Sequence, residues 1–358
     1  MNVLHFLAAG GTGGIESLIR EYADKSSLNN YYVIFWGGGV NSEIMKTKGH
    51  NVIELDCSKK EVWKTYKKLT QLVNKYEIDA IVTHHAAAAM WFHMTMLKNK
   101  FPNLSTYIYA HGALRDMIRV ENKQWILCKT VFDFAFKRCN AVIAISESVK
   151  NSFLEFGYKL DKIQVIYNGV DCSKFIPNIS DNDQVIHLAY VGRLIKQKGI
   201  DRLLKAVSLI NTTTPFVCDI VGDGVERKNL ETLAHELNIM DKVNFYGVRN
   251  DIPMFLPNEN IFVHPASWEE GFGIAVVEGM AAGLVTVAFK KGAIPEIIDN
   301  GINGFIVDDE SPEALAKCIE DIIDNYNTDE IRKIREAAVI KSKKFDMSIF
   351  VKSLDEAI

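Results

Sequence analysis

The chain alternates short β-rich runs with helical patterns along its whole length, and this alternation constrains its fold more than any other feature. The strand candidates of the first half are VLHFLAA (3–9), YYVIFW (31–36), NVIEL (51–55), AIVTH (80–84), STYIYA (105–110) and AVIAI (141–145). Continuous apolar runs of this kind are typical of parallel strands that are covered on both faces. The pattern therefore predicts a parallel sheet between two layers of helices.

The second half repeats this pattern. Its strand candidates are VIHLAYV (185–191), PFVCDIV (215–221), VNFYG (243–247), IFVHP (261–265), LVTVAF (284–289) and GFIV (304–307). Helical periodicity occupies the intervening stretches, as in 200–210 and 312–324. The repetition predicts an α/β protein with two Rossmann-like, doubly wound domains that face a cleft, where ligands bind at the carboxyl ends of the strands.

The boundary between the two domains is marked by NGVDCSKFIPNISDND (168–183), which contains turn residues, a proline and no periodicity. We interpret 169–183 as a linker. The N-terminal domain then comprises residues 1–168, and the C-terminal domain comprises residues 184–344. We expect the last helix, about 345–358, to pack back on the N-terminal domain.

Composition excludes several classes of protein. Of the 358 residues, 48% are hydrophobic and 24% are charged, which argues against disorder. No apolar stretch reaches the roughly 18–20 residues of a membrane span, and MNVLHFLAAGG reads as a first strand instead of a signal peptide. The six cysteines form no CxxC pair, which indicates reduced thiols in a cytoplasmic protein.

Charge is distributed unevenly between the halves. The net charge of −4 argues against a nucleic-acid partner. Residues 1–168 carry +6, however, and the remaining residues carry −10. This asymmetry indicates an anionic surface facing the N-terminal half.

The glycine-rich segment AAGGTGGIESLI (8–19) follows the first strand and opens a helix, whose first N–H groups can hold phosphate. A dinucleotide-binding fold is the first interpretation to consider. The pattern from Gly11 is Gly-x-Gly-x-x-Glu, with Glu16 in place of the third glycine, and the second strand ends without an acid for a ribose. NAD binding is therefore disfavoured, whereas Gly13 and Gly14 would let a diphosphate approach the backbone closely.

A second loop, in YVGRLIKQKGIDRLL (190–204), places Arg193 and Lys198 between a strand end and a helix. A diphosphate needs such cations, arginine as a bidentate fork and lysine as a point charge. The alternative is a solvated basic loop, because Lys196 is basic too. Gly222, in the turn of IVGDGVERKNL (220–230), ends the next strand and would add a rim of backbone.

Two carboxylates stand out in SWEEGFGIAVVEGMAAG (267–283). Glu278 is the only charged residue in the apolar run 274–282, and Glu270 lies eight residues earlier, before Gly-Phe-Gly. A buried carboxylate without a partner costs several kcal/mol. The spacing alone does not say what the two acids hold.

With these motifs the chain resembles the retaining glycosyltransferases of family 4, which have the GT-B fold. The resemblance covers most of the chain and is strongest over 165–307. It rests on VIYNGVDCSKF (165–175), YVGRLIKQKGIDRLL (190–204), VGDG (221–224), HPASWEEGFGIAVVEGMAAG (264–283), IPEIIDNGINGFIV (294–307), GGTGGIESL (10–18), AHGALRDM (110–117) and VIAISESV (142–149). The spacing from Glu270 to Glu278 within this ordered set is the most specific element.

The resemblance implies a nucleotide-sugar donor, a UDP-sugar first of all, held mainly by the C-terminal domain. It implies that Glu278 binds the ribose hydroxyls and that Glu270 faces the donor sugar. The N–H groups of Phe272, Gly273 and Ile274, at a helix start, would meet sugar hydroxyls or phosphate.

The resemblance also implies catalytic roles for basic residues. Arg193 and Lys198 would neutralise charge growing on the leaving nucleoside diphosphate, and Gly13 and Gly14 would close over the phosphates from the acceptor-side, N-terminal domain. His111 would lie near the donor sugar, although spacing alone favours a core histidine. Three further residues fall at motif positions: Ser146, Asn168 and Glu296.

No cofactor and no essential metal are expected. Asp181-Asn182-Asp183 matches the Asp-x-Asp pattern of metal-dependent glycosyltransferases but lies in the predicted linker, where a solvated turn is favoured. Glu270 and Glu278 are assigned to sugar and ribose, which leaves no acid pair for Mg²⁺. His84 and His85 follow another strand and could line the acceptor side, but such residues are more often loop histidines, so we leave them out of the site.

Two basic stretches are compatible with either a solvated surface or a membrane-binding surface. KKEVWKTYKKLTQLVNKY (59–76) has Val62, Tyr66, Leu69 and Val73 at helical spacing, with Lys64, Lys67 and Lys68 mostly elsewhere. A second helical stretch, 117–138, mixes Arg119, Lys123, Lys129, Lys137 and Arg138 with Trp125 and several phenylalanines. These are either solvated helix faces or a peripheral surface for anionic lipid at the inner face of the cell membrane.

The sequence therefore predicts a cytoplasmic retaining glycosyltransferase that acts on a saccharide or lipid-linked saccharide in surface polysaccharide or glycolipid synthesis. Alternatives within the fold are a nucleotide-sugar epimerase or hydrolase. A non-catalytic sugar-nucleotide-binding protein is the alternative from another class, and a dinucleotide oxidoreductase ranks third.

Overall fold

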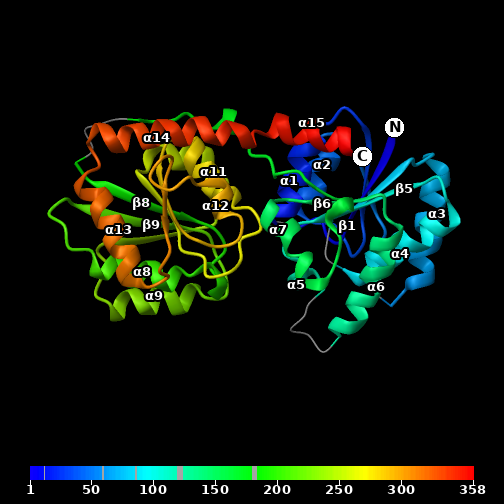
Figure 1. Cartoon of the computed structure of the whole chain (residues 1–358), viewed down its shortest axis with the longest axis horizontal. Coiled ribbons are helices and arrows are strands. Elements are labelled where there is room, and N and C mark those ends of the chain that lie inside the picture. The colour runs from blue at the N-terminus through cyan, green and yellow to red at the C-terminus, as the bar shows by residue number, and fades with distance from the viewer. Residues whose placement is uncertain (12, 59, 85–86, 119–123, 180–183) are drawn as a thin grey trace. The chain divides into compact units, whose positions relative to one another are not determined.

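The computed structural model describes all residues except 12, 59, 85–86, 119–123 and 180–183 (Figure 1). The chain divides into two compact units. Unit 1 comprises Met1–Gly169 and Met347–Ile358, and unit 2 comprises Val170–Asp346. The chain therefore leaves unit 1 after Gly169 and returns to it at Met347 for its last helix.

Unit 1 is built on a seven-stranded parallel sheet. Its strands are β1 (Asn2–Leu7), β2 (Asn29–Ile34), β3 (Asn51–Glu54), β4 (Ala80–Thr83), β5 (Ser105–Ala110), β6 (Ala141–Ala144) and β7 (Ile163–Val165), in the order β3-β2-β1-β4-β5-β6-β7. The first six confirm the sequence-based strands. The short β7, three residues at the edge, was not predicted because its run is too brief to show a pattern.

Helices cover both faces of this sheet. They are α1 (Gly14–Ala23), α2 (Val40–Thr47), α3 (Val62–Lys75), α4 (Ala88–Lys100), α5 (Leu114–Met117), α6 (Trp125–Arg138), α7 (Glu147–Asn151) and α15 (Met347–Ala357). Helix α1 contacts α2 and α15, whereas α4 contacts α3 and α6. Since strand order reverses at β1 and crossovers are right-handed, the two groups lie on opposite faces.

The last helix, α15, is held in unit 1 by buried side chains and by polar contacts at its end. Phe350 packs edge-on against Tyr22 of α1 with ring centroids 6.0 Å apart. Asp355 accepts hydrogen bonds from the Tyr22 hydroxyl (2.6 Å) and from the Ser26 hydroxyl (2.8 Å). The final carbonyl, of Ile358, accepts from the Tyr107 hydroxyl at 2.7 Å.

Unit 2 has a six-stranded parallel sheet. Its strands are β8 (Ile186–Val191), β9 (Phe216–Val221), β10 (Val243–Gly247), β11 (Ile261–His264), β12 (Val285–Phe289) and β13 (Phe305–Val307), in the order β10-β9-β8-β11-β12-β13. All six confirm the sequence-based strands. The chain thus repeats one architecture twice.

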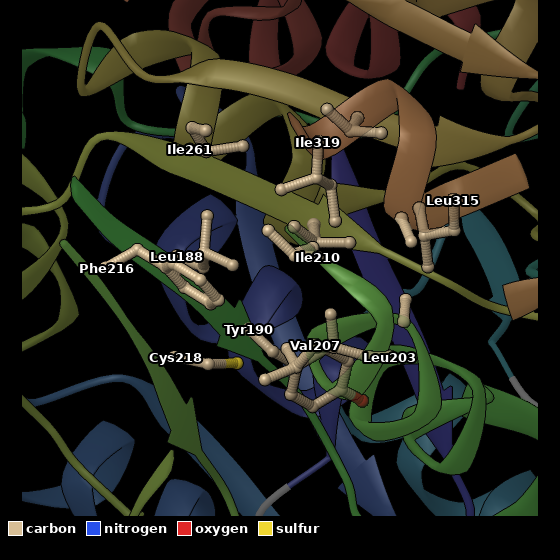
Figure 2. Close-up of a cluster of buried hydrophobic side chains, with 14 of the residues drawn as sticks. Leu188, Tyr190, Leu203, Val207, Ile210, Phe216, Cys218, Ile261, Leu315 and Ile319 are labelled. Atoms are coloured by element: carbon tan, nitrogen blue, oxygen red, sulfur yellow. The ribbon is translucent and has the colours of Figure 1, made fainter. Parts of the chain in front are cut away.

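The helices of unit 2 are α8 (Ile200–Leu209), α9 (Arg227–Glu236), α10 (Ile252–Phe255), α11 (Ile274–Ala281), α12 (Ile294–Ile297), α13 (Pro312–Asp324) and α14 (Asp329–Ser342). Helix α13 packs against α8, and α14 packs against α11. Figure 2 shows the core between sheet and helices, where Leu188 and Tyr190 of β8 meet Leu203 and Val207 of α8. Apolar residues at helical spacing form this face, so α8 and α13 confirm the expected helices.

Two helix predictions need correction. The helix expected over 117–138 begins at Trp125 instead, because α5 is a single turn closed at Ile118, whose N–H donates to Leu114 (2.9 Å). In α3, Leu69 and Val73 are buried as expected, whereas Val62 and Tyr66 are only partly buried. Val62 is the first residue of α3, where the helix lacks a preceding turn to cover it.

Candidate functional site

The predicted site residues of unit 2 follow the two strands between which the sheet changes direction. Strands β8 and β11 are neighbours in the sheet; from β8 the chain continues to β9 on one side of this pair, and from β11 it continues to β12 on the other side. Ligands of doubly wound sheets bind at the carboxyl ends of strands at such a switch point. Arg193 and Lys198 follow β8, and Glu270 follows β11.

Lys198, Glu270 and His264 form the central cluster of this site. The Lys198 ammonium donates to Oε2 of Glu270 at 2.6 Å, and Nε2 of His264 lies 3.0 Å from the same oxygen. The Lys198 and Glu270 side chains are 23% and 19% exposed. Burial by itself raises the pKa of the Glu270 carboxyl, but the hydrogen bonds and charges of His264 and Lys198 outweigh it and hold that pKa well below its usual range.

Close backbone packing fixes the positions of Lys198 and Glu270. Gly199 has a φ of +68°, and a Cβ there would lie 2.0 Å from the carbonyl oxygen of Pro265, so only glycine allows the two loops to touch. The N–H of Ser267 donates to the Gln197 carbonyl at 3.1 Å. The Glu270 carbonyl accepts from the N–H of Ala293 at 2.8 Å. The ion pair is therefore held from both sides by main chain.

Arg193 differs from Lys198 in its surroundings. Its side chain is exposed and has no ion-pair partner among the described residues. Gly222 supports the loop that carries it, because its φ is +134° and a Cβ there would lie 1.8 Å from the Gly192 carbonyl oxygen. The N–H of Gly222 donates to Gly247 at 2.8 Å. Gly222 therefore shapes the turn, and its N–H is already in use.

Helix α11 begins at the predicted backbone nest. Gly273 caps it with a φ of +107°, and no side chain caps it. Within the described residues, the N–H groups of Gly273 and Ile274 have no acceptor, as expected at a helix start. Phe272 is buried, with its ring centroid 5.4 Å from that of Phe345.

The structure corrects the environment expected for Glu278. Its apolar sequence neighbours suggested a buried carboxylate, but the side chain is partly exposed, on the same face of α11 as Ile274. The helix buries Val276, Val277 and Met280 on its other side. A helix has 3.6 residues per turn, so Glu278 lies on a different face from the buried Val276, Val277 and Met280 although these residues are close to it in sequence.

In unit 1, His111 ends a row of three histidines. His5 in β1 lies 2.8 Å (Nδ1) from Nε2 of His84, whose Nδ1 lies 3.4 Å from Nε2 of His111. His5 and His84 are fully buried, and His111 is partly exposed. His84 follows β4 outside any strand, as the sequence predicted, but it is buried beside His5 because β4 is a central strand of the sheet.

Hydrogen-bond donors assign a direction to this row. The Asn30 amide donates to the Ser26 hydroxyl at 2.9 Å, so its oxygen accepts from Nε2–H of His5 at 2.9 Å. Burial lowers the pKa of His5 to about 4, which keeps it neutral with Nδ1 as an acceptor. His84 then donates through Nε2 to His5, and its Nδ1 faces Nε2 of His111. The row fixes the ring orientation of His111 from the core outward.

The remaining predicted residues have identifiable structural surroundings. Gly13 caps α1, and Gly14 is its exposed first residue. Ser146 is buried and caps α7, where its hydroxyl accepts from the Val149 N–H at 3.0 Å. Asn168 is buried and accepts from the Tyr109 hydroxyl at 3.3 Å. Glu296 is partly exposed in α12.

Several predicted residues lie outside the described part of the chain: His85, Arg119, Lys123, Asp181 and Asp183. The six cysteines are all free thiols. Sequence reasoning missed His264, although it opens the quoted motif HPASWEEGFG. It also missed His5 and Asn30, for which the sequence offers no signal.

The basic surface of α3 is partly neutralised. Lys64 pairs with Glu61 at 2.7 Å, and Lys68 donates to the Leu55 carbonyl at 2.5 Å. Lys67 and Trp63 are exposed. No helix in the described parts of the chain combines the length and hydropathy of a membrane span.

Comparisons with known proteins match both halves of the chain. Residues 173–340 match the family described as "Glycosyl transferases group 1", and residues 12–174 match "Glycosyltransferase Family 4". An uncharacterised glycosyltransferase of Haemophilus influenzae is 26% identical over 328 residues, which cover 88% of each chain.

Solved structures share the fold over its whole length. Anabaena Alr3699/HepE in complex with UDP has a TM-score of 0.84 at 23% identity, covering 100% of this chain and 99% of that one. The same protein has also been solved with UDP-glucose. The lipopolysaccharide outer core galactosyltransferase WaaB has a TM-score of 0.78 at 18% identity, covering 100% and 99%. The two Rossmann-like units thus form the GT-B fold.

Proposed function

This chain belongs to the group 1, family 4 glycosyltransferases, and from that premise we propose a retaining enzyme that takes its sugar from a UDP-sugar. We propose as acceptor a saccharide or lipid-linked saccharide of a surface polysaccharide or glycolipid. The donor proposal is supported by HepE, which was solved with UDP and with UDP-glucose. The acceptor proposal is supported by WaaB, which acts in the lipopolysaccharide outer core.

The observation that carries the proposal is the cluster of Lys198, Glu270 and His264 at the switch point of unit 2, with Arg193 in the same loop as Lys198. When the bond between the anomeric carbon and the β-phosphate oxygen breaks, negative charge develops on the departing diphosphate. A preorganised ammonium and a guanidinium stabilise that charge most in the transition state. Glu270 remains ionised, so it holds Lys198 in place and offers its second oxygen to sugar hydroxyls.

Helix α11 would bind the rest of the donor. The uncapped N–H groups of Gly273 and Ile274 suit a phosphate or sugar oxygen, because the positive end of the helix dipole points there. Glu278 lies one turn along the partly exposed face from Ile274, within reach of a nucleoside whose phosphates meet the helix start. We assign it to the two ribose hydroxyls.

We assign His111 to the donor sugar. Its ring is oriented by the row of His84 and His5, so it presents a defined edge to a ligand. Gly13 and Gly14 begin α1, whose first N–H groups suit a second phosphate contact. No divalent metal is assigned a role in the transfer, because cations of the chain occupy the position where the leaving group would need one.

A nucleotide-sugar screen tests this function. Thermal shifts with UDP-, GDP- and ADP-sugars identify the donor, because a ligand that binds only the folded state stabilises it. Incubation of the identified donor with saccharide and lipid-linked acceptors should release UDP in step with transfer, and NMR should find the donor's anomeric configuration in the product. Isomerisation of the donor, hydrolysis without transfer, or binding without turnover would support the epimerase, hydrolase or binding-protein alternatives. An inverted product would overturn the retaining assignment.

A further inference from the structure

We propose that His187, Asp219 and Glu259 bind a divalent cation of the zinc class in unit 2. His187 is the second residue of β8, and Glu259 lies two residues before β11. Asp219 reaches toward them from the middle of β9. The proposed donor contacts follow the carboxyl ends of β8 and β11, so this site is a separate one at the other end of those strands.

The sheet register brings the three side chains together. His187 pairs with Val217, and Ala189 pairs with Asp219, so His187 and Asp219 are diagonal neighbours on one face. One ligand atom from each of the three residues lies within 4.8 Å of the others. Nδ1 of His187 and Oδ2 of Asp219 are 3.1 Å apart, which is the spacing of two ligands on a tetrahedral zinc ion with bonds of about 2.0 Å.

An unpartnered carboxylate oxygen points to a missing cation. Glu259 is 6% exposed, and its Oε2 has no hydrogen-bond partner in the described structure. The second carboxylate, of Asp219, is 2% exposed. Two ionised carboxylates are costly in such a place unless a cation lies between them.

Among the described residues, no nearby cation fills this role. Arg249 is the neighbouring cation, and its guanidinium already donates two hydrogen bonds to Asp251, at 3.0 and 2.6 Å. Asn244 donates to Oδ1 of Asp219 at 2.8 Å, which orients that carboxylate and leaves Oδ2 for a ligand bond. Such an outer partner is a regular feature of metal sites.

The donor set selects the class of ion. One imidazole nitrogen with two carboxylates suits zinc and related transition metals, whereas Mg²⁺ and Ca²⁺ prefer oxygen ligands alone. A neutral imidazole, two carboxylates and a divalent ion sum to zero charge, which suits a buried position. The His187 side chain is 38% exposed, so the ion has an entry path and a water can complete its coordination. The ion would tie β8, β9 and the start of β11 together.

Metal titration of the full chain tests the proposal. Chelator-treated protein is titrated with ZnCl₂ and, separately, with MgCl₂, and bound metal is measured by equilibrium dialysis. The variants are Glu259→Gln and His187→Gln, with Glu236→Gln and His235→Gln as matched controls, since both control residues are exposed on unit 2. Partly exposed thiols can also bind zinc, so only the equivalent that Glu259→Gln removes is assigned to the site.

We expect one such zinc equivalent in the wild type and in both controls, and a higher melting temperature when it is bound. Each ligand variant should weaken zinc binding by more than the roughly 10- to 100-fold that an outer partner contributes. Glu259→Gln removes a buried charge, so the metal-free variant should fold at least as well as the wild type. Zinc binding that Glu259→Gln leaves unchanged, no saturable equivalent in the wild type, or a preference for Mg²⁺ would overturn the proposal.

Discussion

Removing Lys198 and removing Arg193 should separate catalysis from stability, because the two cations have different surroundings. Lys198 is the 2.6 Å partner of Glu270, whereas the exposed Arg193 has no ion-pair partner in the described chain. Lys198→Ala therefore leaves His264 as the one ion-pair partner of Glu270 within the described chain. Arg193→Ala leaves no buried charge behind. Both substitutions remove a cation from the proposed leaving-group site.

The stability difference can be estimated from the pair. Breaking a fully buried ion pair costs roughly 3–5 kcal/mol. Lys198 and Glu270 are about a fifth exposed and His264 remains at 3.0 Å, so we expect about 2 kcal/mol for Lys198→Ala. For a unit of this size, that free energy lowers the melting temperature by about 4–8 °C. For Arg193→Ala we expect less than about 0.5 kcal/mol, as for other surface substitutions.

The catalytic effects should be similar for both variants. A lost charge contact to a departing diphosphate is worth roughly 2–4 kcal/mol, which is about 30- to 1000-fold in kcat. The double variant Lys198→Ala, Glu270→Gln removes the stranded carboxylate, so its melting temperature should recover while its kcat stays low. Lys196→Ala, an exposed lysine in the same loop, should change neither quantity.

Calorimetry gives the melting temperatures, and UDP release under saturating donor and acceptor gives kcat. Near wild-type kcat in the double variant Arg193→Ala, Lys198→Ala would refute the leaving-group role. An unchanged melting temperature in Lys198→Ala would show that the pair with Glu270 contributes nothing to stability, against the estimate above.

Four further predictions follow from single features. Glu278→Ala should weaken UDP binding about 10- to 100-fold by calorimetric titration, since a charged acceptor to the ribose is lost; unchanged affinity would contradict the ribose role. Initial rates should survive excess EDTA without added Mg²⁺ or Mn²⁺ even if the melting temperature falls, whereas a strict metal requirement would contradict leaving-group stabilisation by the chain alone. Salt-sensitive binding to anionic liposomes should fall when Lys64, Lys67 and Lys68 are neutralised, with Lys67 contributing most because Lys64 and Lys68 already have partners; equal co-sedimentation would favour a solvated face. Burial lowers the pKa of His93 to about 4, so the unfolded chain binds more protons between pH 6.5 and 4, and the folded state loses stability as the pH falls through that range. In denaturant titrations the free energy of unfolding of His93→Phe should fall less than that of the wild type over this range, by up to about 3 kcal/mol. Parallel pH profiles of the two proteins would contradict this.

The alternation of apolar runs and helical patterns was sufficient to predict twelve of the strands and the doubly wound class, because the periods of strands and helices are local properties of the chain. The motif HPASWEEGFG and the glycine loops were likewise recognisable, since close backbone approach demands glycine at particular positions such as Gly222. The family resemblance rests on the same local stretches. The brief β7 and the start of α6 at Trp125 escaped prediction because few residues signal them.

Which side chains meet was decided by the tertiary structure alone. Lys198 and Glu270 are separated by 72 residues, and His5 and His84 by 79. They come together because strand order places β8 beside β11 and β1 beside β4, and no local pattern encodes strand order. The grouping of His187, Asp219 and Glu259 depends further on the register between β8 and β9, since a shift by one residue would turn Asp219 to the opposite face.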